Sequence, residues 1–595
     1  MHKFSFLLLS FLISISAWAR YNYTLQWDKP NTHTYRITLE TEPQTDDYTD
    51  VQAALWRPGR YITQDFAAAI WDVSAKDAAG NSLKIQKINK NTWRVFHAKT
   101  SKISVKYAYY AENDDAGSSY YVEGQVYFNP SNCFMYVPNR WDEPVNLTLP
   151  DLPSSWKVAT ALTPTKDPHL FTAQSYHEFA DCPTVFADKM KILKFQAKGT
   201  TFFLYFQGEY KGTVAVDSAL VQQIRKIVLQ QAAVFGCFPF KTYHFIYRLL
   251  DYDMRHAVEH SNSASFVLPA RVTETEKGIV GGVCGITSHE FWHAWNVKRI
   301  RPDALVPYDY SKEQYTGLHW FTEGVTDYYS TLTMIRAGVI SREEGLRTFA
   351  SSFQTLDNTY SYSVVSPEES SFDSWLAPSP YAHPLHGTSY YPSGQRLGFL
   401  IDVQIMAITK GKKSLDDVFR YLYITYAEKG LGVPEEGVQK AIELISGVSW
   451  QDFFDKYVHH TKPIDYEQLL KGTGLSLSIK ENNNTTWEKL GILQYEKIEQ
   501  GWFVKKIDPA GEAYKAGIGV GDLIFKVNGK SPSEVNESEV FKALQKGKEL
   551  SLYFMNQQGY EHKETLKYTG AAVPRMYSFS MEKNNALIEN WLKEK

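Results

Sequence analysis

The residues with the clearest capacity for chemistry form one short run, His289-Glu290-Phe291-Trp292-His293. On a helix, side chains four positions apart lie on the same face one turn apart, so both imidazoles can reach a single metal ion. Glu290 lies about 100° around the helix from His289, close enough to hold a water molecule bound to that metal. Imidazole ligands with a carboxylate and one open position make a catalytic zinc site. The run therefore predicts a zinc-dependent hydrolase with Glu290 as the catalytic base.

A catalytic zinc ion needs a third protein ligand, and residues 319–329 are typical of a second helix that would supply it. Glu323 lies in the middle of this aromatic stretch, where a buried carboxylate needs a partner such as a metal. The sequence offers four alternatives: Asp303, Glu313, His319 and Asp327. The first two lie in a polar loop typical of solvated surface, and the last is better placed to orient a ligand. We therefore predict Glu323 as the third ligand.

Length and composition limit the classes of protein to consider. A chain of 595 residues exceeds what one hydrophobic core usually organises, so several domains are expected. The 43% apolar and 22% charged residues are ordinary for a globular protein. The formal net charge of −3 leaves no electrostatic basis for nucleic-acid binding and no polybasic membrane patch.

The first nineteen residues have the features of a signal peptide. A short basic start precedes the apolar run Phe4 to Ile15, and Ala17-Trp18-Ala19 supplies the small residues that a signal peptidase reads. The apolar run is too short to span a bilayer, and no later segment is long enough. We therefore expect export to the periplasm or secretion, with no stable membrane anchor. Four cysteines are free or paired in one of three ways: Cys133, Cys182, Cys237 and Cys284.

Patterning along the chain predicts a multidomain α+β protein. Short alternating runs separated by turns predict a β-sandwich-like domain over 20–185. Strands and then helical periodicity, including candidate helices at 219–235, 414–428 and 434–445, predict a mainly helical catalytic domain over 186–470. Short strands and Gly-rich turns return over 471–573, and a polar tail without assigned function covers 574–595.

Several longer motifs resemble the M61 family of metallopeptidases, the glycyl aminopeptidase family, which is related more distantly to the M1 aminopeptidases. They are His289 to Pro302, Trp320-x-x-Glu323-Gly324-x-Thr326-x-Tyr328-Tyr329, Ser370 to Trp375, Asp452 to Tyr457 and Trp56-Arg57-Pro58-Gly59-Arg60-Tyr61. The resemblance covers nearly the whole mature chain. It implies a thermolysin-like catalytic fold behind an N-terminal β domain, and it places Glu323 at the third-ligand position.

The same resemblance points to a residue that would bind the substrate's amine. Val258-Glu259-His260 is similar to the family's Gly-Gly-Leu-Glu-His segment, whose M1 relative binds the free amine through its glutamate. A carboxylate beside a substrate-facing strand can pair with an α-ammonium group and restrict cleavage to the first residue. The two glycines are replaced by His256 and Ala257, a change expected to reshape the pocket. The alternative is a glutamate paired locally or solvated.

A tyrosine is the expected stabiliser of the transition state. Tyr390-Tyr391-Pro392-Ser393-Gly394 resembles a Tyr-x-Lys-Gly segment whose hydroxyl stabilises the negatively charged oxygen of the tetrahedral intermediate. The resemblance places Tyr391 in that role, with Tyr390 as its rival. Ser393 replaces the lysine, so any contribution from that charge is absent. The alternative is a core tyrosine.

The C-terminal module resembles a PDZ domain over 508–518 and 521–529. PDZ domains bind extended chain ends by adding a strand to a sheet edge, and Leu490-Gly491-Ile492 falls where the carboxylate-binding loop is expected. The expected partners are peptide or protein substrates, together with an extended chain end at this module.

The predicted function is an exported zinc metallopeptidase, an aminopeptidase acting on small first residues such as Gly or Ala. Its site would comprise His289, His293 and Glu323 as ligands, Glu290 and Tyr391 as catalytic residues, and Glu259 as the amine anchor. One alternative is a metalloendopeptidase whose PDZ module recruits exported proteins. The other is a non-catalytic peptide-binding protein, against which the intact Glu290 argues.

Overall fold

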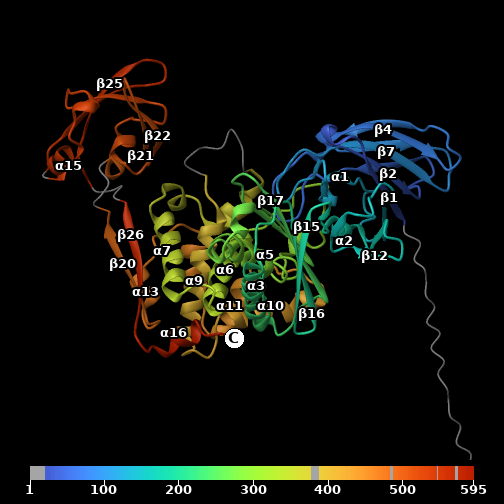
Figure 1. The fold of residues 1–595 in the computed structure, drawn as a ribbon. Coiled ribbons are helices and arrows are strands. Elements are labelled where there is room, and N and C mark those ends of the chain that lie inside the picture. The colour runs from blue at the N-terminus through green and yellow to red at the C-terminus, as the bar shows by residue number, and fades with distance from the viewer. Residues whose placement is uncertain (1–19, 377–386, 483–486, 546, 570–573) are drawn as a thin grey trace, which may run out of the picture.

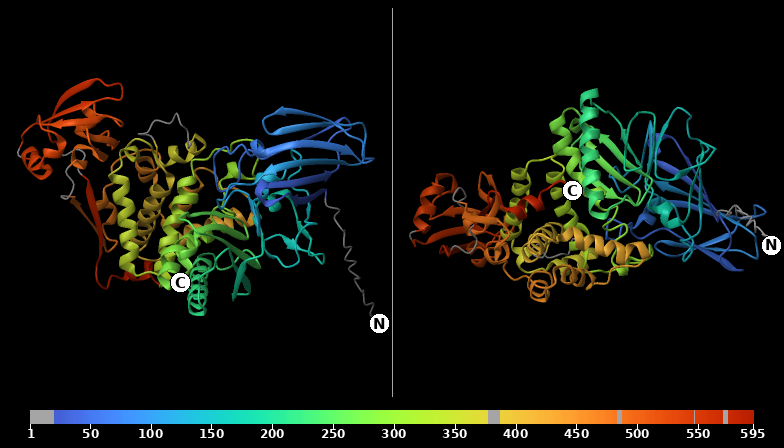
Figure 2. Two further views of the ribbon diagram at one scale, coloured as in Figure 1. Left: turned by 45° about the horizontal axis from the view of Figure 1, so that its top comes forward. Right: turned by 90° about the horizontal axis from the view of Figure 1, so that it is seen from below.

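The computed structural model describes residues 20–376, 387–482, 487–545, 547–569 and 574–595. The predicted signal peptide, 1–19, lies outside these residues. Figure 1 shows a β-rich N-terminal part and a small β-rich C-terminal module at opposite sides of a mainly helical central part, and Figure 2 shows the same order from two further directions. This arrangement confirms the predicted multidomain α+β fold.

The N-terminal part is built from three sheets. The largest has the order β12-β13-β10-β1-β2-β7-β4, and the others are β11-β14-β9-β8 and β3-β6-β5. Alternation sets the inner face of β2 (Thr34–Thr41), where Tyr35, Ile37 and Leu39 are fully buried. The other strands are β1 (Tyr21–Trp27), β3 (Tyr48–Gln52), β4 (Ile70–Asp77), β5 (Lys84–Asn89), β6 (Thr92–Phe96), β7 (Ile103–Tyr110), β8 (Tyr120–Val122), β9 (Gln125–Phe128), β10 (Val145–Thr148), β11 (Lys157–Ala159), β12 (Thr163–Pro164), β13 (Leu170–Ala173) and β14 (Thr184–Ala187), with α1 (Pro130–Cys133) and α2 (Tyr176–Ala180).

The central part begins with a five-stranded sheet of order β15-β16-β17-β19-β18. Its strands are β15 (Met190–Ala197), β16 (Thr200–Gln207), β17 (Thr242–Leu250), β18 (His256–Glu259) and β19 (Ser263–Pro269). Strand β18 lies at the edge, antiparallel to β19, and Glu259 is its last residue. Helix α3 (Val214–Phe235) includes the predicted 219–235 segment; its N-cap Thr213 accepts from the Val216 backbone N–H, and Gly236 ends it with φ 85°.

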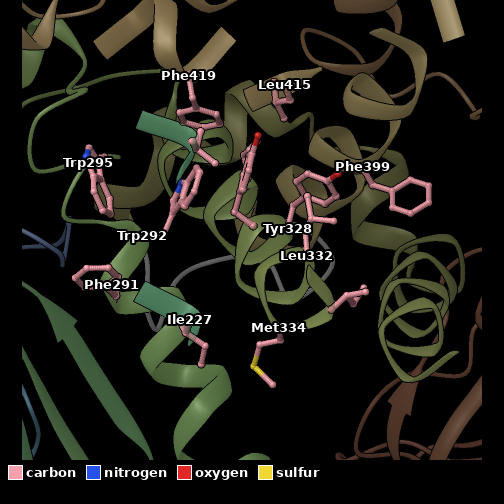
Figure 3. Packing of buried hydrophobic residues seen from close by; sticks show 14 of the residues in the cluster. Ile227, Phe291, Trp292, Trp295, Tyr328, Leu332, Met334, Phe399, Leu415 and Phe419 are labelled. Atoms are coloured by element: carbon pink, nitrogen blue, oxygen red, sulfur yellow. The ribbon is translucent and has the colours of Figure 1, made fainter. Parts of the chain in front are cut away.

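The helical half surrounds the candidate site. Helix α5 (Gly285–Trp292) packs against α6 (Val325–Arg336), and a π-helix, η6 (Trp320–Gly324), leads directly into α6. Figure 3 shows Trp292, Tyr328, Phe399 and Phe419 in the buried core between these helices. The remaining helices are α4 (Glu276–Ile279), α7 (Arg342–Asp357), α8 (Pro367–Phe372), α9 (Tyr390–Ile408), α10 (Leu415–Thr425), α11 (Gly437–Ser446), α12 (Gln451–Tyr457) and α13 (Tyr466–Leu470).

The predicted helices at 414–428 and 434–445 are present with altered ends. Ser414 is the N-cap of α10, and its backbone N–H donates to Asp417 Oδ2 over 3.0 Å. Helix α11 begins at Gly437 rather than Pro434, after Gly437 N–H has bonded to the Pro434 carbonyl over 2.8 Å. A proline can start a turn without being inside the helix.

The C-terminal module has a five-stranded sheet of order β21-β22-β23-β24-β25. Its elements are β21 (Ile492–Ile498), β22 (Gly501–Ile507), β23 (Leu523–Val527), β24 (Leu550–Met555), β25 (Glu561–Leu566), α14 (Glu512–Lys515) and α15 (Glu537–Gln545). The Leu490, Gly491 and Ile492 N–H groups donate to the carbonyls of Trp487 and Glu488. The backbone amides of the expected carboxylate-binding loop are therefore already hydrogen-bonded to carbonyl groups of the same loop.

The predicted tail, 574–595, is instead part of the central fold. Strand β26 (Arg575–Met581) pairs with β20 (Leu475–Glu481) beside α7, and α16 (Ala586–Trp591) buries Trp591 to 1% exposure. Strand β20, which follows the predicted boundary at 471, belongs to this pair and not to the module's sheet. Sequence reasoning missed the packing because the partners of this segment's apolar residues are helices far away in the sequence, such as α7 and α9.

Two further expectations concern cysteines and membranes. The structure contains four free cysteines, of which Cys237 is exposed and the others are buried. No helix within the described residues has the length and apolarity needed to cross a membrane.

Candidate metal centre and active site

Three predicted ligands converge in the core of the central part. His289 lies on α5, His293 is its C-cap residue, and Glu323 lies on η6. The two Nε2 atoms are 3.0 Å apart, and Glu323 Oε2 lies 3.3 Å from His293 Nε2 and 3.9 Å from His289 Nε2. The candidate ligand atoms of all three residues lie within 4.8 Å of one another. The spacing expected from the sequence is therefore realised in three dimensions.

The partners of the two histidines fix the direction of their lone pairs. His289 Nδ1 is 2.7 Å from Asp327 Oδ1, and His293 Nδ1 is 2.7 Å from the Asn296 carbonyl oxygen. Because both partners only accept hydrogen bonds, each Nδ1 is the protonated nitrogen. The Nε2 atom of each ring is then the atom available to a metal ion, and the two Nε2 atoms face each other. Histidine ligands in metal sites are oriented by acceptors in this way.

Burial and charge at Glu323 agree with this interpretation. Its side chain is 3% exposed, and its Oε1 has no hydrogen-bond partner. Burial raises the pKa of Glu323, but the charge and hydrogen bond of His293 lower it further, so the carboxyl ionises below its usual range. An ionised, partly unpaired carboxylate in the core needs a positive partner. The three residues therefore fit a zinc ion.

Glu290 lies on the same helix but outside the ligand set. Its side chain is buried, and burial raises its pKa to about 8, with His289 lowering it and then Glu259 raising it again. Carboxylate oxygens of Glu259 and Glu290 also lie within 4.8 Å of a His293 nitrogen. A buried glutamate poised near neutral pH is suited to exchange protons.

Glu259 reaches this group from the end of strand β18. Its side chain is 4% exposed, and its Oε1 has no hydrogen-bond partner. Among the described residues, no basic side chain forms an ion pair with it. Burial to this extent means that Glu259 is not a solvated surface glutamate.

The two tyrosines follow a close contact between helices. Gly394 of α9 lies directly against Gly324 of η6, and a Cβ at either position would clash with the other element. This contact brings the start of α9 to the ligands: the Tyr391 ring centroid is 6.1 Å from that of His289. Tyr390 instead lies 5.4 Å from His319. Burial raises the pKa of both phenols, so each remains a neutral donor.

The rival ligands lie elsewhere. His319 is fully buried, and burial lowers its pKa to about 4. No cluster of candidate ligand atoms found among the described residues includes Asp303, Glu313 or His319. Asp327 occupies the orienting position that was expected for it.

Sequence reasoning missed the residues that the N-terminal part contributes around the site. Asp181 accepts hydrogen bonds from Lys298 Nζ over 2.8 Å and from the Ser261 N–H over 2.8 Å, and its Oδ1 lies 3.0 Å from His260 Nδ1. Tyr61 stacks on His319 with ring centroids 3.8 Å apart. Tyr61 belonged to a recognised motif, whereas Asp181 carried no local signal.

The fold and the donor set are together those of a metallopeptidase. Residues 22–188 match the Peptidase M61 N-terminal domain, 283–397 match the M61 glycyl aminopeptidase, and 465–555 match the PDZ domain. These matches confirm the predicted resemblance: the chain combines both M61 domains with a PDZ domain.

One solved structure shows the same fold, and a second is less similar. An aminopeptidase N family protein from Idiomarina loihiensis superposes with a TM-score of 0.82 at 23% identity, over 96% of this chain and 100% of that one. A mutant M1 zinc metallopeptidase from Deinococcus radiodurans, bound to a Tyr-Ser-Ala substrate, has a TM-score of 0.45 at 14% identity, over 75% of this chain and 94% of that one. No curated protein sequence matches the chain.

Proposed function

We propose that this chain is an exported zinc metallo-aminopeptidase that removes small first residues, Gly or Ala, from peptides in the periplasm or outside the cell. The observation that carries the proposal is the placement of Glu259 beside Glu290 and His293, with ligand atoms of all three within 4.8 Å. An amine-binding carboxylate at this distance from a metal-dependent hydrolytic site leaves room for one residue between the amine and the scissile bond. The matched M61 glycyl aminopeptidase domain supports the preference for small residues.

The ligands would be His289, His293 and Glu323. A zinc ion held by these three residues would supply Lewis-acid chemistry, lowering the pKa of a bound water molecule and polarising a carbonyl group. The zinc ligands are themselves held in place, because Asp327 and the Asn296 carbonyl orient the two imidazole rings.

Glu290 moves the protons. Its carboxylate accepts a proton from the attacking water and then gives it to the nitrogen of the leaving amine. The raised pKa of about 8 favours such a two-way exchange, and a nearby dication would lower that pKa toward the ionised form.

Tyr391 and Glu259 bind two different groups of the substrate, the scissile carbonyl and the free amine. The neutral Tyr391 hydroxyl donates a hydrogen bond to the carbonyl oxygen as negative charge develops on it. The Glu259 carboxylate pairs with the substrate's α-ammonium group, which fixes the chain end at the site.

The test uses Gly-Ala peptides with free and acetylated N-termini, each with and without a zinc chelator. We expect chelator-sensitive cleavage of the free peptide alone, and Glu290→Gln should lose at least about a hundredfold in kcat. Full activity of the Glu290→Gln variant would contradict the mechanism.

One observation favours the endopeptidase alternative. A cleft of about 600 Å³ separates the PDZ module from the central part and is lined by residues of both, such as Arg396 and Asp508. A longer polypeptide fits such a cleft. Cleavage of the acetylated peptide would therefore favour the endopeptidase.

A further inference from the structure

The motif Trp56-Arg57-Pro58-Gly59-Arg60-Tyr61 belongs to the N-terminal part, yet it is attached to the central part. The Leu55 N–H donates to the Tyr310 carbonyl over 2.8 Å, and Trp56 Nε1 donates to the Asp309 carbonyl over 2.8 Å. The Trp56 ring also packs edge-on against Trp375, with centroids 5.2 Å apart. These contacts hold the segment across the boundary between the two parts.

From this position the segment bridges two components of the site. Gly59, with φ 85°, lies so close to Glu259 that an added Cβ would clash with its carboxylate. Two residues later, Tyr61 stacks on His319. His319 is the N-cap of the π-helix η6 and lies four residues before Glu323, the expected third ligand. Residues 59–61 therefore extend from the amine-binding glutamate to the element that carries the third ligand.

Polar atoms without partners gather along this segment. Tyr61 is 2% exposed and Glu259 is 4% exposed, yet the Tyr61 hydroxyl and Glu259 Oε1 have no hydrogen-bond partner. Leaving a buried polar group unpaired costs about 1 to 3 kcal/mol, so a ligand that hydrogen-bonds to these two atoms would recover that free energy. Burial raises the pKa of Tyr61, and Tyr308, Glu323 and Glu259 raise it further in that order, which agrees with a hydroxyl lying near these three groups.

We propose that Tyr61 is a substrate-binding residue: its phenol oxygen accepts a hydrogen bond from the free α-ammonium group of the peptide, beside Glu259. An ammonium group has three N–H donors, and one carboxylate oxygen satisfies only one of them. Tyr61 supplies a second acceptor from the N-terminal part. This inference deepens the proposed function and rests on it.

The same segment closes the site beyond the amine. Because Gly59 lies so close to Glu259 that an added Cβ would clash with its carboxylate, a polypeptide cannot continue past the amine on that side. The ligand class is therefore a peptide whose first residue has a free ammonium group, and the site is incomplete without the N-terminal part.

The test compares two metal-binding ligands that differ by one amine. Glycine hydroxamate carries the α-amine, and acetohydroxamate lacks it. Calorimetry on the zinc-loaded full chain should show that Tyr61→Phe weakens glycine hydroxamate about tenfold or more, as expected for a lost hydrogen bond to a charged group. Acetohydroxamate binding should stay unchanged.

The matched control is Tyr308→Phe. The Tyr308 hydroxyl is also buried without a partner, and its ring packs on Trp56 with centroids 5.7 Å apart. This variant should change the affinity for neither ligand. Neither variant should lower the melting temperature, because each removes a hydroxyl that has no partner in the fold.

Two outcomes separate the inference from the function beneath it. If the parent protein prefers glycine hydroxamate and Tyr61→Phe keeps that preference, the assignment of Tyr61 is wrong and the aminopeptidase stands. If the parent protein binds both ligands equally, the amine site itself fails, and the proposed aminopeptidase function fails with it. Equal weakening of both ligands by Tyr61→Phe would also overturn the inference.

Discussion

The indole N–H of Trp591 donates to the Tyr328 hydroxyl over 2.9 Å. The Trp591 carbonyl in turn accepts from Arg336 Nε over 2.9 Å, so one residue of α16 binds both the fourth residue and the last residue of α6. Tyr328 directly follows Asp327, the residue that orients His289. A segment that is distant in sequence therefore supports the helix on which the metal site depends.

Replacing Trp591 with Ala should destabilise the protein and loosen this helix. A buried Trp truncated to Ala costs about 3 to 5 kcal/mol, and the variant should also bind zinc more weakly. Chemical unfolding and a zinc competition assay measure the two effects. Trp71→Ala is the control, because Trp71 is 42% exposed and should change neither. Unchanged stability of Trp591→Ala would show that α16 is not part of the cooperative core.

The sequence predicted the parts of the site that depend on local spacing. His289, Glu290 and His293 follow from helical geometry, and Glu323 follows from a carboxylate placed within aromatic residues. Tyr61 and Trp591 could not be assigned in this way, because their roles arise from packing between segments hundreds of residues apart. The same limit explains the prediction of a tail over 574–595, because the apolar residues of this segment are buried by contact with α6 and α9, which are distant in the sequence.

Asp327→Asn should weaken zinc binding. The carboxylate accepts from His289 Nδ1 over 2.7 Å, and losing such a partner typically costs about 10- to 100-fold in metal affinity. Competition with a fluorescent chelator measures the change. Asp303→Asn is the control, since Asp303 lies outside the ligand cluster. Equal zinc affinity of the two variants would rule out an orienting role for Asp327.

Tyr391→Phe should lower kcat about 10²- to 10³-fold on a Gly-capped peptide and change KM little, because its hydroxyl acts only when charge develops. Tyr390→Phe is the matched comparison, since its ring neighbours His319 and not a ligand. Steady-state kinetics distinguish the two variants. A large fall in kcat for Tyr390→Phe alone would transfer the role to Tyr390.

Asp181 should make the join between the N-terminal and central parts sensitive to acid. Burial raises the pKa of this carboxyl, but Lys298 and His260 lower it well below its usual range. A depressed pKa contributes stability that is present above the unfolded value of about 3.9 and is lost as the pH falls below it. The contribution should therefore be complete at pH 7 and decline below about pH 4.

Asp181→Asn tests this linkage directly. At pH 7 the change leaves Lys298, whose side chain is 1% exposed, without its charge partner, and such a loss costs about 3 to 5 kcal/mol. Below about pH 4 the parent carboxyl begins to protonate, so the difference between the two proteins should shrink. Melting temperatures measured across this range report it, with exposed Asp188→Asn as the control. A difference that stayed constant with pH would mean that the ionised Asp181 does not stabilise the join, and that packing around residue 181 holds the two parts together.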